Sequence, residues 1–285
     1  MTVLVFGGSS QIGHFLLPPL CARGEPVLAL SRRPQAQAAR AGLRWIEGRL
    51  PDAVPDVHDV SAVIGFGPLQ PFAEWLAGAA LPLAPRVIAT SSMSAESKRD
   101  SAVPAERAVS RQLLDGEAAL AAACARHGCA WTVLRPTLIY GAGLDKSLTP
   151  IARRALRTRV FPLPAGRGLR QPVHAQDLAQ AVLAALDTPA AAGHILPLGG
   201  GERLSAAEMF ARVRRSLPAP TVPLPLPAWL LRGARHALPR LAGPLDRLEA
   251  DLVADNAESI RLLGVTPRPF RPDADCWRPP APDAP

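Results

Sequence analysis

The strongest constraint on the fold is the stretch VLVFGGSSQIG, residues 3–13, in which an apolar, β-branched run enters a loop of small residues. Such a run predicts a buried strand, and the glycines and serines after it predict a tight turn. From Ile12 onward the apolar residues follow helical spacing. The order of strand, glycine-rich turn and helix is typical of a sheet covered by helices.

Short apolar runs of the same kind recur along the first half of the chain and alternate with longer segments. Long connections allow successive strands to run parallel, with helices on both faces of the sheet. We therefore predict an α/β fold with a Rossmann-type, doubly wound parallel sheet. The predicted strands are 2–6, 26–30, 43–46, 60–64, 86–89 and 131–134.

The pattern changes after about residue 140, where helical spacing over 147–159, 176–186 and 205–216 is separated by proline-rich stretches. We predict a dinucleotide-binding Rossmann domain over 1–140, to which later segments such as 170–200 return. A smaller, mostly helical substrate-binding part follows over 141–270. Residues 271–285 are a proline-rich tail that packs as an extended arm or frays.

Composition excludes several classes of protein. The net charge of +8 comes from 30 arginines and two lysines, but no aromatic residues are interleaved with them, so no nucleic acid is expected as a partner. Four cysteines without a Cys-x-x-Cys pair and six scattered histidines predict no metal site and no disulfide framework. No apolar run approaches the roughly 18 residues of a membrane span, and no leader pattern precedes the first strand, so a cytoplasmic location is expected.

Arg153, Arg154, Arg157 and Arg159 crowd one of the predicted helices. The cluster has two interpretations. It is either a solvated helix face or an anion site for a substrate phosphate.

The first turn has the spacing of a nucleotide site. Gly7, Ser10 and Gly13 recur every three residues after the first strand, which is the pattern that presents backbone N–H groups and a helix N-terminus to a pyrophosphate. Gly7 would permit the turn and Gly13 the close approach of the helix. We assign Ser9, Gln11 and Ile12 to the same site; a purely structural turn is the alternative.

The end of the second strand indicates which dinucleotide is bound. Sites for NAD carry an acidic residue there, whereas a 2′-phosphate needs positive charge. Here the strand ends in Ser31, Arg32 and Arg33. Two guanidiniums and a hydroxyl favour NADP(H) as the cofactor; two ordinary surface arginines are the alternative.

Four segments in order resemble the extended or atypical short-chain dehydrogenase/reductase superfamily, in particular its NAD-dependent epimerase/dehydratase-like branch. The segments are VFGGSSQIG, VIATSSMS, WTVLRPTLIYG and GLRQPVHAQDLAQA. The resemblance runs from Val3 to about Phe270. It implies that Ser92 assists catalysis and that Arg170 contacts a substrate phosphate. It also implies cofactor contacts by Gly65, Phe66, Ser91, Pro136 and Thr137.

The chain departs from that family at the residues that move protons. The family uses a Tyr and a Lys four residues later on one helix, but this chain has a single tyrosine, Tyr140, with a leucine at position 144. Alignment by Glu117 puts Val109 and Leu113 at the two positions, in a predicted apolar stripe with Leu120 and Cys124. Arg49, moreover, stands where family members often have an aspartate directed at the adenine.

Three side chains are candidates to replace the missing pair: Ser92, Lys98 and Tyr140. For the last two the alternatives are a solvated loop lysine and a packed aromatic residue. His174 either contacts the substrate or orients a loop.

Two hypotheses of function follow. The first is an NADP(H)-dependent oxidoreductase or epimerase-like enzyme whose substrate is a small anionic, phosphate-bearing or nucleotide-linked molecule. The second is a non-catalytic NADP(H)-binding protein, a redox sensor or an assembly factor. A homodimer is compatible with both.

Overall fold

A seven-stranded, entirely parallel sheet forms the centre of the protein in the computed structural model, which describes residues 1–37, 40–237 and 239–279. The strand order is β11-β6-β5-β4-β1-β2-β3. The predicted doubly wound sheet is therefore confirmed. Its strands are β1 (Thr2–Phe6), β2 (Val27–Ser31), β3 (Leu43–Glu47), β4 (Val60–Gly65), β5 (Arg86–Thr90), β6 (Trp131–Pro136) and β11 (His194–Leu198).

The order of the strands fixes where a ligand can bind. From β1 the chain goes outward to β2 and β3, and then returns to the other side of β1 with β4. The connections after β1 and β4 therefore diverge at the carboxyl ends of these strands. A crevice opens at such a switch point in doubly wound sheets, and the glycine-rich turn lies there.

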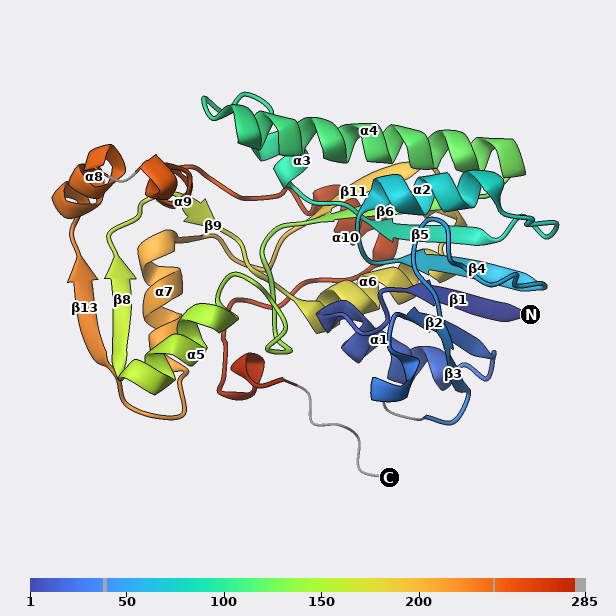
Figure 1. Ribbon diagram of the computed structural model, residues 1–285, viewed down its shortest axis with the longest axis horizontal. Helices are drawn as coiled ribbons and strands as arrows, with labels where there is room; N and C mark the ends of the chain where they lie inside the picture. Colours follow the sequence, from blue (N-terminus) through green and yellow to red (C-terminus); the bar gives the residue numbers. More distant parts are fainter. Residues whose placement is uncertain (38–39, 238, 280–285) are drawn as a thin grey trace.

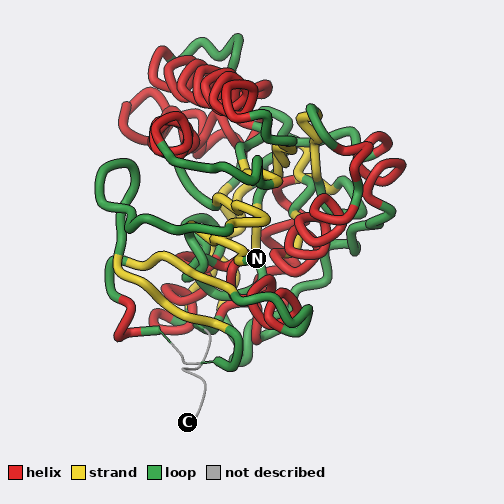
Figure 2. Tube along the Cα trace, turned by 90° about the vertical axis from the view of Figure 1, so that its right-hand side faces the viewer, coloured by secondary structure: helices red, strands yellow, loops and turns green. Residues whose placement is uncertain are grey.

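Helices cover both faces of the sheet (Figures 1 and 2). One layer contains α2 (Leu69–Gly78) and α4 (Pro104–His127), which pack against each other. The opposite layer contains α1 (Gln11–Cys21), α6 (Ala175–Asp187) and α10 (Ala257–Leu263). The predicted returning segment 170–200 thus supplies a covering helix and the edge strand β11.

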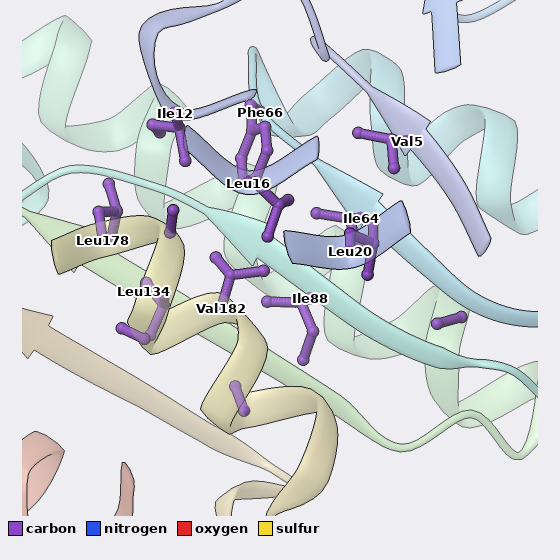
Figure 3. Packing of buried hydrophobic residues seen from close by; sticks show 14 of the residues in the cluster. Val5, Ile12, Leu16, Leu20, Ile64, Phe66, Ile88, Leu134, Leu178 and Val182 are labelled. Carbon is purple, nitrogen blue, oxygen red and sulfur yellow. The ribbon is translucent and has the colours of Figure 1, made fainter. Parts of the chain in front are cut away.

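Each helix layer closes its own apolar core. In the core of Figure 3, α1 contributes Leu16 and Leu20 and α6 contributes Leu178 and Val182, against Ile88 of the sheet. Residues four apart share one face of a helix, so each pair points at the strands. All five side chains are fully or almost fully buried.

A smaller lobe lies beside the sheet, at the left of Figure 1. Its strands β8 (Val160–Pro164) and β13 (Val222–Leu226) pair in parallel. Phe161, Met209 and Phe270 are buried in its core. The helices of this lobe are α5 (Thr149–Thr158), α7 (Ala206–Arg215), α8 (Ala228–Ala237) and α9 (Pro239–Glu249).

The described part of the proline-rich tail packs against this lobe. Cys276 and Trp277 are buried in a short 3-10 turn, and Trp277 Nε1 donates to Ser216 Oγ at 2.8 Å. As far as residue 279 the tail therefore packs on the lobe and is not frayed, and its regular structure is limited to this short turn; residues 280–285 lie outside the described part. None of the described helices is long and apolar enough to cross a bilayer.

Candidate functional site

The turn after β1 has the geometry of a nucleotide cradle. Gly7 has φ +74°, and a Cβ there would lie 2.2 Å from the Phe66 carbonyl oxygen. A Cβ on Gly13 would lie 2.0 Å from the Gly8 oxygen. Both positions therefore require glycine, Gly7 for its conformation and Gly13 for the close approach of α1 to the turn. Gly8, which the sequence interpretation did not assign, is also buried in this turn.

Side chains of the turn have different tasks. Ser10 caps α1, since its Oγ accepts from Gly13 N at 3.3 Å. Ile12 is 4% exposed and its side chain belongs to the core, so the predicted cofactor contact of this residue can come only from its backbone. Ser9 is exposed at the turn, and the buried Gln11 Oε1 has no hydrogen-bond partner. The first turn of α1 carries no acidic residue, so its positive end favours an anion.

A pocket of about 210 Å³ extends from this turn to the end of β2. Ser31 and Arg32 line it, together with Gly65 and Phe66 of β4 and the following loop. Arg33 does not line it; its backbone N donates to Ser31 Oγ at 3.1 Å while its side chain is exposed elsewhere. Arg49 lines the pocket in its place. The sequence marked Arg49 only as a departure from the family, yet it is the second guanidinium of this pocket.

A larger cleft of about 570 Å³ lies between the sheet and the smaller lobe. Gln11, Ser92, Lys98, Thr137 and Arg170 line the same cleft, although they come from four separate parts of the sequence. The structure therefore brings together the nucleotide turn, two of the three catalytic candidates, Ser92 and Lys98, and the predicted phosphate contact.

The serines after β5 (Arg86–Thr90) lie at the floor of this region. Ser92 Oγ accepts from Ser94 N at 3.1 Å, which leaves its own hydrogen free to be donated. Ser91 Oγ is buried without a partner. Orphaned buried hydroxyl and amide oxygens are costly, so Ser91 and Gln11 indicate that a polar ligand completes the site. Pro136 is buried at the end of β6, and Thr137 Oγ1 donates to the Gln171 carbonyl.

Lys98 follows α3 (Ser94–Ser97) and points into the cleft. Its Nζ is 4.0 Å from Glu106 Oε1, and both side chains are about four-fifths buried, with exposures of 21% and 17%. Glu106 Oε2 also accepts from Ser101 Oγ at 2.8 Å. No local pattern in the sequence marked Glu106, because its approach to Lys98 depends on how α4 packs on the preceding loop.

The helix α4 offers no proton-transfer pair at the family positions. Val109 is 39% exposed and Leu113 is half-buried, whereas Leu120 and Cys124 are fully buried. The predicted apolar stripe is thus corrected: it packs only in the second half of the helix.

Two candidates lie outside the cleft and their predicted roles are corrected. Tyr140 is 1% exposed and packs edge-to-face against His174 and Phe270; burial raises the pKa of its phenol. His174 caps α6 by accepting from Gln176 N through Nδ1, and burial lowers its pKa to about 4. Tyr140 belongs to the core of the smaller lobe, and His174 packs against Tyr140 and Phe15, so neither side chain lines the cleft.

Arg170 keeps its predicted place. It is 6% exposed, and its Nη1 donates to the carbonyls of Leu169 and Ala250 at 2.8 and 2.5 Å. None of the described carboxylates is within ion-pair distance of its guanidinium, although Asp251 lies near enough to act through its charge. Burial lowers the pKa of Arg170, and a buried, unpaired guanidinium in a cleft favours an anionic ligand.

No group of three His, Cys, Asp or Glu side chains in the described part of the chain is arranged to hold a metal ion.

The chain is similar to known sugar-nucleotide enzymes. Residues 89–199 match the model of the "NAD dependent epimerase/dehydratase family". A UDP-glucose 4-epimerase of Vibrio cholerae is 29% identical over 141 residues, 47% of this chain and 41% of that protein. The alignment thus spans less than half the length of this relative.

Solved structures match over almost the whole chain. MoeE5 in complex with UDP-glucose and NAD has a TM-score of 0.71 at 20% identity, covering 97% of each chain. The UDP-glucuronic acid 4-epimerase of Bacillus cereus, in complex with UDP-glucuronic acid and NAD, also has a TM-score of 0.71, at 16% identity, over 97% of this chain and 96% of its own. At these identities the likeness establishes a common fold.

Proposed function

We propose that this chain, which belongs to the epimerase/dehydratase branch of the extended short-chain dehydrogenase/reductase superfamily, is an NADP(H)-dependent oxidoreductase or epimerase. Its substrate is an anionic carbonyl or sugar compound, phosphate-bearing or nucleotide-linked. The proposal rests on one observation above all: a single cleft is lined by Gln11 of the nucleotide turn, by Ser92 and by the buried Arg170.

The residues present fit a dinucleotide. Gly7 and Gly13 allow the tight turn and the close approach of α1 that present backbone N–H groups, and Gln11 Oε1 and Ser91 Oγ are buried without partners. The turn and the start of α1 would hold the pyrophosphate. Arg32 and Arg49 would hold a 2′-phosphate, since both line the pocket at the end of β2. When bound, the cofactor supplies hydride transfer.

Arg170 and Ser92 divide the work on the substrate. The guanidinium of Arg170 binds the substrate's phosphate and holds the reacting carbon in the cleft. The hydroxyl of Ser92 donates to the substrate oxygen, because Ser94 N occupies one of its two acceptor positions and leaves its hydrogen free. This donation stabilises the charge that develops on that oxygen.

The proton itself needs a source, since α4 presents Val109 and Leu113 where the family has its acid. Lys98 is the cationic donor of this cleft that lies on the same loop as Ser92. We assign it the task of giving the proton to the substrate oxygen, directly or through Ser92.

The experiment is a comparison of binding with turnover. The purified chain is expected to bind NADPH and to oxidise it with at least one carbonyl from a panel of sugar nucleotides and sugar phosphates. Arg170→Met should raise KM for an anionic substrate at least about tenfold while kcat changes less. The control is Arg126→Met, an exposed arginine in the last turn of α4, which should leave both parameters unchanged.

The second candidate is a non-catalytic NADP(H)-binding protein. The aliphatic face of α4 at Val109 and Leu113 favours it. Tight NADPH binding without any oxidation of NADPH, and without epimerisation of any sugar nucleotide in the panel, would establish this second function in place of the first.

A further inference from the structure

The strands β8 and β13 and the helix α8 lie at the end of the smaller lobe that is farthest from the central sheet (Figure 1), and large apolar side chains are exposed there. On the paired strands β8 and β13, Val160, Val222 and Leu224 are 39%, 63% and 48% exposed. Trp229 and Leu230, the second and third residues of α8, are 67% and 41% exposed. These five residues, the exposed apolar end, are half of the large hydrophobic residues that the described chain exposes. Such a gathering on one end marks an interaction surface.

The strand β13 cannot recruit a further strand to cover this end. Val222 N donates to Arg159 O and Leu226 O accepts from Ala165 N, so residues 222, 224 and 226 turn their backbone groups toward β8. The alternate positions on the free edge are Pro223 and Pro225, which have no N–H. Prolines at these positions block strand addition. The occupant must therefore bind through the exposed side chains.

Side chains from both strands meet on the outward face of this pair. Val160 and Val222 are register partners, and Leu224 follows two residues later on the same face. Phe161, on the opposite face, is fully buried in the core of the lobe. In α8, Leu231 turns inward with Ala165 and Ala228, whereas the preceding Trp229 and Leu230 remain exposed.

The exposed charges on β8 and the segments beside it are positive, whereas Asp246 and Glu249 of α9 line a pocket with Arg167. Residues 147–168 contain five arginines and no aspartate or glutamate. Arg154, Arg157, Arg159 and Arg167 are exposed. No carboxylate of the described residues forms an ion pair with these four. The five are Arg153, Arg154, Arg157, Arg159 and Arg167.

From this juxtaposition we infer that the exposed apolar end and its arginines form a docking surface for an anionic lipid bilayer. A tryptophan beside aliphatic residues inserts at the depth of the headgroups, and arginines around it bind the anionic headgroups. The side chains protrude from a strand face and a helix start, so a bilayer accepts them without a matching cavity. An acidic protein would need shape complementarity to this surface.

The test is co-sedimentation of the full chain with vesicles of phosphatidylglycerol and phosphatidylcholine, compared with vesicles of phosphatidylcholine alone. Binding to the anionic vesicles is expected, with a strong decrease at 0.5 M salt. The tryptophan fluorescence should shift to the blue on binding, and Trp229→Phe should abolish the shift because the other four tryptophans are half-buried or buried.

Two pairs of variants test the two parts of the surface. Trp229→Ser with Leu230→Ser, and Arg157→Glu with Arg159→Glu, should each lower the partition coefficient at least about tenfold. The matched controls lie on the other lobe: Leu83→Ser, whose side chain is 49% exposed, and Arg111→Glu on α4. Both controls should bind as the unchanged chain does, and thermal unfolding should show that all variants are folded.

Three results would overturn the inference. The first is no binding to anionic vesicles, and the second is equal binding to both kinds of vesicle. The third is a concentration-dependent dimer that the surface variants dissociate while vesicle binding is absent; the surface would then contact a second copy of the chain.

Discussion

The structure predicts that two adjacent arginines, Arg32 and Arg33, contribute differently to the choice between NADPH and NADH. Arg32 and Arg33 both follow β2, but Arg32 lines the pocket beside the glycine turn and Arg33 does not. Arg32→Ala should therefore weaken NADPH binding at least about tenfold and leave NADH binding nearly unchanged. A tenfold loss of affinity corresponds to about 1.4 kcal/mol of binding free energy. A charge-assisted contact to a phosphate contributes more than that in a buried site. Because Arg32 is exposed, solvent reduces its expected contribution to about 1.4 kcal/mol.

The assay is fluorescence titration of the unchanged chain and the variants with NADPH and NADH. The unchanged chain should bind NADPH at least about tenfold more tightly than NADH. Arg33→Ala is the matched control and should change the ratio less than about twofold, while Arg49→Ala should act like Arg32→Ala because it lines the same pocket. A preference for NADH, or equal losses in the Arg32 and Arg33 variants, would refute the reasoning.

Further predictions concern catalysis and acid stability. Ser92→Ala should lower turnover about a hundredfold with NADPH affinity unchanged, measured under saturating substrate; unchanged turnover would remove Ser92 from the reaction. The double variant Val109→Tyr, Leu113→Lys should raise reductase activity on a generic carbonyl, because a positioned acid increases the rate by about 10² to 10⁴. If this variant folds and binds NADPH but shows no gain in activity, the result counts against a catalytic cleft. The pKa of His174 is lowered to about 4 in the folded chain. Between about pH 6.5 and 4 the unfolded chain therefore binds a proton at this residue that the folded chain excludes. The free energy of unfolding should fall by up to about 3 kcal/mol as the pH falls through this range. In His174→Asn, which keeps a helix-capping oxygen, urea unfolding at several pH values should show a smaller fall, and an identical pH dependence would contradict this assignment.

Edge strand β11 shows where a strand prediction from sequence fails. The six predicted strands are β-branched or apolar runs, and the structure contains a strand at each of them. β11 contains Pro197, which argues against a strand, but the strand lies at the edge of the sheet, where a missing N–H is tolerated. Its position at the edge is a property of the sheet and is not encoded in the segment itself.

Gly7 and Gly13 illustrate what the sequence alone determined. Glycine is required at both positions because a Cβ would clash with Phe66 O at position 7 and with Gly8 O at position 13. Their spacing after an apolar run is a local signal in the sequence. The parallel sheet follows from the same kind of local information, because long connections between short apolar runs leave few other arrangements. The roles of Ser92 and Arg170 at the site were also predicted from short segments, through the resemblance of these segments to the family.

Only the tertiary structure decided which side chains share a site. Arg49 joins Arg32 because β3 pairs with β2, and Glu106 approaches Lys98 because α4 packs against the loop after β5. Tyr140 and His174 have the residue types of proton-transfer groups, yet both enter the core where β7 (Ile139–Tyr140) pairs with β10 (Val173–His174). Residue type and spacing determined the fold and the nucleotide cradle. The direction of a side chain depends on contacts with residues distant in the sequence, so packing determined the chemistry of the cleft.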